Sequence, residues 1–306
     1  MKIAFLFSGQ GAQYPGMMKD LYDTADSARK VFVTADESLE RCVSELCFNG
    51  TQEELNLTHN TQPCMLAADL AAAYALKEKG VEPDAVAGFS LGEYAALVYS
   101  GVISMSDAFK MVQIRADAMQ EAVAPGEGAM AAMIGAPADR IEELCAKIED
   151  GYVVAANYNS PVQTVISGTA SGVDAVLAMA EKAGIRGMKL AVSAPFHCGL
   201  MKPAADKLSE LFKTCEFYKP SLPVYMNVDG KVHGDGIEGL LVQQAMSPVR
   251  WTDTLRNMQA AGVDTFIECG PGRTLSGLVK KTLSGVNICR VENMKTLEST
   301  LAALGK

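Results

Sequence analysis

Residues 85–92 read AVAGFSLG and combine a short apolar run with a Gly-x-Ser-x-Gly motif centred on Ser90. The apolar run at 85–88 predicts a buried strand, and the pattern at 92–99 predicts a helix directly after it. Small residues flank a serine in such a turn because the backbone segments approach closely, and the turn exposes the hydroxyl at the helix N-terminus. The stretch therefore predicts an α/β fold that carries a nucleophilic serine. An ordinary strand-to-helix turn remains the alternative.

Two further apolar runs, at 2–7 and 265–269, are each followed by a glycine turn and a helical pattern. Short strands that alternate with helices are typical of a mostly parallel sheet covered on both faces, here an α/β-hydrolase-like domain. Ligands of such sheets bind beyond the carboxyl ends of the strands. We therefore expect the turns at 9–11, 88–92 and 270–272 to lie together at the site.

The middle of the chain, residues 126–196, has a different order of elements. Its pattern is βαββαβ, which predicts a ferredoxin-like domain inserted into the larger one. Glycine- and proline-containing segments at 125–128 and 193–195 bound it. The large domain is then assembled from residues 1–125 and 197–306. In the insertion we expect strands at 130–134, 152–157, 164–167 and 188–192 and helices at 138–148 and 173–184.

Composition excludes several classes of function. The formal net charge of −9 and the pI near 5.0 disfavour a nucleic-acid surface, which needs clustered Lys and Arg. The sequence contains no apolar run of the roughly 18 residues that a membrane span requires, so we expect a cytoplasmic protein. Its eight cysteines form no Cys-x-x-Cys pair and have no His at ligand spacing, so we expect no metal site.

A serine nucleophile needs a base, and the chain contains only three histidines. His197 follows the apolar segment at 194–196, where the chain returns from the inserted domain to the large one. His59 lies in a polar loop and His233 in a glycine-rich one. His197 is therefore the candidate base, although a histidine after an apolar stretch, taken alone, is more often structural.

Arg115 interrupts an apolar helix face. Ser104 and Asp107 form a Ser-x-x-Asp cap for a helix that places Arg115 in register with Met111 and Met119. One interpretation is a snorkelling side chain with its guanidinium in water. The other is a partly desolvated cation that holds an anionic ligand, since the planar guanidinium binds a carboxylate through two hydrogen bonds.

The turn Gly9-Gln10-Gly11 lacks the third glycine of a dinucleotide-binding loop, because Tyr14 occupies that position. We therefore reject NAD binding. A tight glycine turn can instead direct a main-chain amide at the serine site, where it would form an oxyanion hole with the amide of Leu91.

Several motifs together resemble the malonyl-CoA:acyl carrier protein transacylase family over essentially the whole chain. They occur in the order that this family shows, and an ordered set is far more specific than any single motif. The matching segments are residues 7–11, 61–63, 88–93, Arg115, 157–160, 195–197 and 270–272.

The resemblance implies a catalytic role for four of these residues. Ser90 attacks the malonyl thioester, and His197 acts as general base and then as general acid. The main-chain amides of Gln10 and Leu91 hold the oxyanion. In this family a main-chain carbonyl orients the histidine in place of a carboxylate, and we assign that carbonyl to Arg250, within the segment 247–251.

The resemblance also implies how the substrate is held. Arg115 pairs with the free malonyl carboxylate, while Gln62 and, from the small domain, Asn157 and Asn159 line the pocket. Phe196, beside the histidine, resembles the malonyl-selecting form of the pocket, in which a bulky ring limits room for an α-methyl branch.

The implied reaction is ping-pong, from malonyl-CoA to Ser90 and then to the phosphopantetheine thiol of acyl carrier protein. It needs no metal and no bound organic cofactor, and it supplies fatty-acid or polyketide synthesis. Two other functions remain open: a serine thioesterase or esterase, which passes the ester to water, and a non-catalytic subunit that binds the carrier protein.

Overall fold

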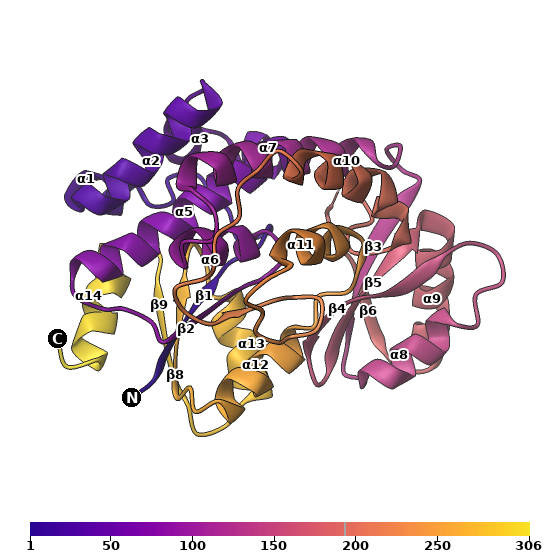
Figure 1. The fold of residues 1–306 in the computed structure, drawn as a ribbon. Coiled ribbons are helices and arrows are strands. Elements are labelled where there is room, and N and C mark those ends of the chain that lie inside the picture. The colour runs from indigo at the N-terminus through magenta and orange to yellow at the C-terminus, as the bar shows by residue number, and fades with distance from the viewer. Residues whose placement is uncertain (193) are drawn as a thin grey trace.

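The computed structural model describes residues 1–192 and 194–306. Ser193, in the predicted boundary segment 193–195, lies outside the described residues. The described residues form two sheets, one of five strands and one of four, and Figure 1 shows them side by side with helices packed around each. No helix of the described residues combines the length and the hydrophobicity needed to cross a membrane.

The large sheet is parallel in every described pairing, in the order β7-β2-β1-β8-β9. Phe7 at the end of β1 is level with Gly88 of β2 and with Cys269 of β8. The three glycine turns therefore leave the sheet at one level, as the sequence predicted. The strands are β1 (Ile3–Phe7), β2 (Ala85–Gly88), β7 (Val224–Tyr225), β8 (Thr265–Cys269) and β9 (Asn287–Val291).

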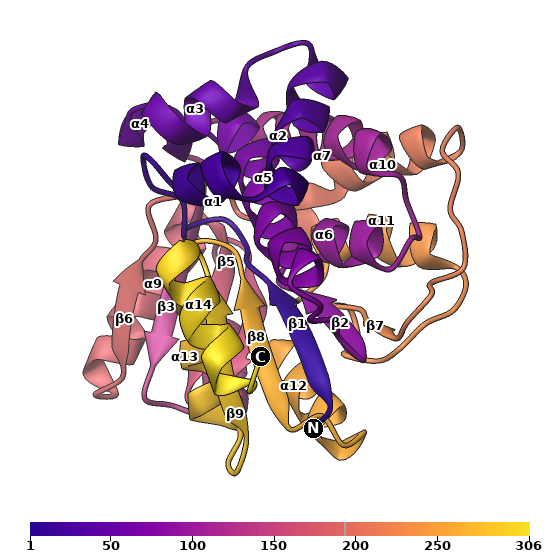
Figure 2. The same ribbon diagram turned by 90° about the vertical axis from the view of Figure 1, so that its left-hand side faces the viewer.

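Helices cover both faces of this sheet, and its strands β1, β2 and β8 are accordingly buried along their whole length. Phe5 and Phe7 belong to one buried cluster, and Ala4 and Leu6 belong to another, as expected for side chains that alternate along a strand. Figures 1 and 2 show α5 and α6 on one face and α12 and α13 on the other. The helices of the large domain are α1 (Lys19–Thr24), α2 (Asp26–Leu39), α3 (Val43–Asn49), α4 (Gln52–Asn56), α5 (Thr58–Glu78), α6 (Gly92–Tyr99), α7 (Met105–Glu121), η1 (Gly199–Met201), α10 (Lys202–Phe212), α11 (Ile237–Met246), α12 (Trp251–Ala260), α13 (Thr274–Thr282) and α14 (Met294–Ala303).

The small sheet has the order β4-β5-β3-β6 with antiparallel pairing, which is the ferredoxin-like arrangement expected of βαββαβ. Two helices pack with it around a separate core. The opposite face, with Met130 and Val165, faces the large domain's cluster. The elements are β3 (Gly128–Ile134), α8 (Ala138–Cys145), β4 (Val153–Ser160), β5 (Gln163–Thr169), α9 (Ala170–Lys182) and β6 (Arg186–Lys189).

The last strand of the small sheet lies earlier than the predicted range 188–192. β6 occupies Arg186–Lys189, paired with β3, and its four residues are exposed. The apolar run that suggested a later strand contributes Leu190 and Val192, which pack against the large domain's cluster. The predicted range still contains the end of the strand, since the amide of Leu190 donates to the carbonyl of Met130 in β3 at 2.9 Å, but it misses the start of the strand.

Main-chain hydrogen bonds join the two domains beside β4. The amide of Tyr158 donates to the carbonyl of Val249 at 2.9 Å, and the amide of Val249 donates to the carbonyl of Ala156 at 2.9 Å. Arg250 stacks on the Tyr158 ring at 5.2 Å from its centroid. The end of β4 is thus attached to the large domain, which sets the position of its polar residues at the site.

Candidate active site

Ser90 occupies the sharp turn between β2 and α6, with a φ of 53°. A β-carbon on Gly88 would lie 1.9 Å from the carbonyl group of Gly92, and one on Gly92 would lie 2.3 Å from the carbonyl oxygen of Phe7. Both flanking glycines are therefore required by close backbone approach. The left-handed conformation of Ser90 is strained for a residue with a side chain, and strain of this kind concentrates at functional sites.

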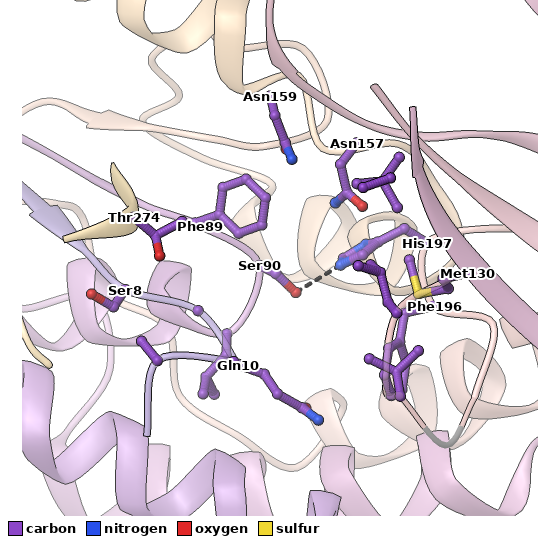
Figure 3. A pocket seen from close by; sticks show the side chains of 18 of the residues that line it. Ser8, Gln10, Phe89, Ser90, Met130, Asn157, Asn159, Phe196, His197 and Thr274 are labelled. Atoms are coloured by element: carbon purple, nitrogen blue, oxygen red, sulfur yellow. Dashed lines mark hydrogen bonds between the residues drawn. The ribbon is translucent and has the colours of Figure 1, made fainter. Parts of the chain in front are cut away.

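His197 lies directly opposite the serine, and its Nε2 is 2.7 Å from Ser90 Oγ (Figure 3). Its Nδ1 is 2.9 Å from the main-chain oxygen of Gln244. A carbonyl can only accept, so Nδ1 carries the hydrogen and Nε2 is left to accept the serine proton. His197 also has a positive φ, 60°, so both members of the pair have strained backbones.

The assignment of the histidine's main-chain partner to Arg250 is wrong. Gln244 supplies this carbonyl because it lies in the last turn of α11, where carbonyls have no partner within the helix. The carbonyl of Arg250 instead accepts from the amide of Thr254 at 3.0 Å in the first turn of α12.

Burial, together with the nearby positive charge of Arg115, lowers the pKa of His197 to about 4, although the Gln244 and Ser247 carbonyls act in the opposite direction. The imidazole is therefore neutral at pH 7 and can accept a proton from Ser90.

Arg115 is 2% exposed, so it is not a snorkelling side chain. Its Nη1 donates to Gln62 Oε1 at 2.7 Å, and its Nη2 donates to Ser90 Oγ at 3.1 Å and to Gln244 Oε1 at 3.0 Å. These acceptors are all neutral, and within residues 1–192 and 194–306 no carboxylate forms an ion pair with the guanidinium. A buried cation beside the nucleophile, held only by neutral groups, is suited to an anionic ligand.

A cavity of about 260 Å³ opens around the serine between the two domains. Figure 3 shows Phe89 and Gln10 to the left of and below Ser90, Asn157 and Phe196 to its right, and Asn159 above it. Every site residue predicted from the sequence except Arg250 lines this cavity: Ser90, His197, Gln10, Leu91, Arg115, Gln62, Phe196, Asn157 and Asn159.

The turn at 9–11 lies against the serine turn. A β-carbon on Gly9 would be 2.8 Å from the carbonyl oxygen of Phe89, so only glycine permits this approach. The amides of Gln10 and Leu91 have no acceptor among the described residues, and both residues line the cavity beside Ser90. Two free amides beside a nucleophile are the components of an oxyanion hole.

Comparison with known proteins identifies the family. The acyl transferase domain family matches residues 4–300. The chain belongs to this family. The acyltransferase is 45% identical to the malonyl CoA-acyl carrier protein transacylase of Bacillus subtilis, over 99% of this chain and 97% of that one. It is 40% identical to the Escherichia coli K12 protein of the same name, over 98% and 99%.

Solved structures agree with the assignment. The acyltransferase superposes on the malonyl CoA-acyl carrier protein transacylase of Clostridium perfringens with a TM-score of 0.97 at 42% identity, covering 100% of this chain and 98% of that one. It also matches a malonyl-transacylase solved in complex with a type II polyketide acyl carrier protein, with a TM-score of 0.96 at 40% identity over 99% and 100% of the two chains.

Two residues of the acyltransferase site were not found from the sequence, Asn227 and Gln244. Asn227 Oδ1 accepts from the amide of Ser90 at 2.7 Å, and its Nδ2 donates to the carbonyl of Gly88 at 2.6 Å. Gln244 Nε2 donates to the carbonyl of Ser90 at 2.8 Å. The one available signal was that Asn227 follows β7 at the carboxyl edge of the sheet, where polar residues of α/β folds gather at sites.

Proposed function

We propose that the chain transfers a malonyl group from malonyl-CoA to the phosphopantetheine thiol of acyl carrier protein through an ester on Ser90. One observation carries the choice of acyl group: the buried guanidinium of Arg115 contacts the nucleophilic oxygen, and its hydrogen-bond partners within the described part of the chain are all neutral. A malonyl group carries a carboxylate two carbons from the reacting carbonyl, so one cation at this position can bind the anion while Ser90 reaches the thioester.

In the acylation half, His197 Nε2 accepts the proton of the Ser90 hydroxyl as Oγ attacks the thioester carbon. The carbonyl oxygen becomes an oxyanion and is held by the amides of Gln10 and Leu91. When the intermediate collapses, the carbon–sulfur bond breaks and the CoA sulfur takes the proton from His197. The products are malonyl-Ser90 and free CoA.

The second half reverses these roles. The carrier protein's thiol gives its proton to His197 and its sulfur attacks the ester carbon, forming a second oxyanion at the same amides. Collapse breaks the bond to Ser90 Oγ, which recovers its proton from His197. Each proton and electron pair is accounted for by protein side chains and the two thiols, so we propose that no metal or organic cofactor takes part.

The remaining residues select and orient the substrate. Gln62 fixes the guanidinium of Arg115 at 2.7 Å, and Asn157 and Asn159 present polar side chains from the small domain. The ring of Phe196 limits space beside His197 and favours malonyl over branched acyl groups. This supply of malonyl groups serves fatty-acid or polyketide synthesis, and we place the enzyme in the cytoplasm, where malonyl-CoA and carrier proteins meet.

Intact-protein mass spectrometry after brief mixing with malonyl-CoA tests the proposal. We expect a malonyl adduct on the wild type, none on Ser90→Ala, and loss of the adduct when phosphopantetheinylated carrier protein is added. An adduct that is lost to water while the carrier remains unmodified would establish a hydrolase. Absence of any adduct with malonyl-CoA or other acyl-CoAs would leave a carrier-binding subunit.

A further inference from the structure

Glu93 is a buried carboxyl group in the first turn of α6, three residues after the nucleophile, and its side chain has no access to solvent. Its Oε1 accepts from the main-chain amide of Asn227 at 2.5 Å, and its Oε2 accepts from Gln244 Nε2 at 2.9 Å. A carboxyl group is expensive to bury, and substitution often preserves or improves stability where such a group has no task beyond packing. The placement therefore calls for a function.

Both partners of Glu93 hold the backbone of Ser90, from opposite sides. Asn227 binds the Ser90 amide through Oδ1 and the Gly88 carbonyl through Nδ2. Gln244 binds the Ser90 carbonyl through Nε2. The strained φ of 53° at Ser90 is thus held by two side chains that both attach to one carboxyl group.

The orientation of the Gln244 amide depends on this carboxyl group. Its Nε2 has two hydrogens, which go to the Ser90 carbonyl and to Glu93 Oε2. Its Oε1 therefore faces Arg115 and accepts from Nη2 at 3.0 Å, while its main-chain oxygen holds His197. A hydrogen-bond acceptor at position 93 therefore keeps Gln244 Nε2 directed at the Ser90 carbonyl and Gln244 Oε1 directed at Arg115.

We propose that Glu93 is a positioning residue for acyl transfer, which orders Asn227 and Gln244 so that Ser90, His197 and Arg115 keep their mutual geometry. This inference rests on the proposed function, and Glu93 itself touches neither substrate nor the reacting atoms. Burial raises the pKa of Glu93 to about 8, against the effects of Asn227, Arg115 and Gln244. Whether Glu93 is protonated or ionised, each of its carboxyl oxygens keeps a lone pair that can accept the hydrogen bond from Asn227 or Gln244.

Glu93→Gln tests the proposal with almost no change in volume. A glutamine can accept from Asn227, but its NH₂ then meets the Gln244 NH₂, so the Gln244 amide must turn and present nitrogen to Arg115. Asp36→Asn is the matched control, because the half-buried Asp36 also accepts two hydrogen bonds, from Ser44, far from the cavity.

Two rates are measured for each variant: single-turnover acylation by malonyl-CoA and labelling of Ser90 by a fluorophosphonate. We expect Glu93→Gln to lower both by about 10- to 100-fold, since misplacement of a catalytic group by about 1 Å can cost 10²-fold. The Tm of Glu93→Gln should fall no further than the Tm of the control Asp36→Asn, and the control should show wild-type values of both rates. The fluorophosphonate does not require malonyl chemistry, so labelling tests Glu93 even if the wild type fails to react with malonyl-CoA.

A double-mutant cycle with Gln244→Met tests whether Glu93 acts through its partner. The rate of the double variant, Glu93→Gln with Gln244→Met, should fall by less than the product of the fold-losses of the two single variants. Both substitutions disrupt the same hydrogen bond between Glu93 and Gln244, so their effects are not independent. Three outcomes would each overturn the proposal. The Glu93→Gln variant could be labelled by the fluorophosphonate at the wild-type rate, or the losses of rate in the double variant could be strictly multiplicative. The third outcome is a loss of rate in Glu93→Gln that comes with a Tm below that of the control variant.

Discussion

The two walls of the cavity differ in chemistry. The large domain contributes a hydrogen-bonded set, in which Ser90, Arg115 and Gln244 contact one another directly. The facing strands β3 and β5 contribute apolar side chains such as Met130 and Val165, and polar groups lie at the end of β4 and at Gln163, the first residue of β5. The comparison teaches that reactivity resides in one wall, while the other shapes the space and excludes water, which strengthens electrostatic interactions at the serine.

The backbones of the two walls differ as well. Ser90 and His197 have positive φ values of 53° and 60°, whereas no residue other than glycine in the described part of β3 or β5 does. Regular strands tolerate replacement of a side chain because their backbone geometry needs no further support. The reactive wall depends on close backbone contacts, so substitutions there should have the larger effects.

The largest effect is expected at the nucleophile. Ser90→Ala should lower transfer by about 10⁴-fold or more, because loss of a nucleophile removes the covalent route altogether. Binding of malonyl-CoA, measured by calorimetry, should persist, since Arg115 remains. Residual acylation at another residue, seen as an adduct in the mass spectrum, would contradict this division of roles.

Arg115→Met should reduce the preference for malonyl-CoA over acetyl-CoA by about 10- to 150-fold, the equivalent of one charge-assisted hydrogen-bonded contact of about 1.5–3 kcal/mol. The ratio of kcat/KM for the two substrates measures it. Arg41→Met is the control: Arg41 also donates to neutral acceptors, Asn60 and the carbonyl of His59, but outside the cavity. Unchanged discrimination in Arg115→Met would refute the carboxylate contact.

The pH dependence of acylation reports on His197. Its pKa of about 4 means that the base stays neutral at pH 5.5, where a histidine with the ordinary value of 6.5 would be about 90% protonated. We expect the acylation rate at pH 5.5 to remain near its value at pH 7, whereas a base with the ordinary pKa of 6.5 would give a roughly 10-fold lower rate at pH 5.5. Arg115→Met should raise this pKa, because it removes a neighbouring positive charge, and so move the acid limb toward neutrality. Stopped-flow acylation across pH 4.5–8 tests both statements.

The same shift affects stability. The folded state keeps His197 neutral while the unfolded chain binds a proton below about pH 6.5, so this contribution to stability is present above that pH and is lost as pH falls toward 4. Urea unfolding at pH 7 and pH 5 should show the decrease, and His197→Gln should show a smaller one.

The smallest effect is expected in the apolar wall. Val165→Ala should change KM for malonyl-CoA only a few-fold and leave the acylation rate near that of the wild type, because no reacting group contacts it. The neighbouring Ile166 points to the small domain's own core, so Ile166→Ala is the control that lowers Tm without changing KM. A large fall in acylation rate for Val165→Ala would remove the distinction between the walls.

Local signals located the nucleophile and its base. The strand, glycines and helix around Ser90 are neighbours in sequence, and close packing within a few residues forces the glycines there. His197 was found because the chain offers only three histidines and this one follows the domain junction. The orienting carbonyl was misplaced because any carbonyl can accept, and only the end of α11 shows that Gln244 is free to do so.

The sequence by itself determined three strands of the large sheet with their glycine turns, the βαββαβ order of the inserted segment and the serine turn, because periodicity and glycine spacing express interactions between residues close in the chain. Only the tertiary structure decided which distant groups support that turn. Asn227 and Gln244 reach Ser90 from 137 and 154 residues away, and Arg115 acquires its neutral partners only when α7, α5 and α11 meet. Such contacts depend on how whole helices and strands are placed relative to one another. The local pattern of residues along the chain does not encode that placement.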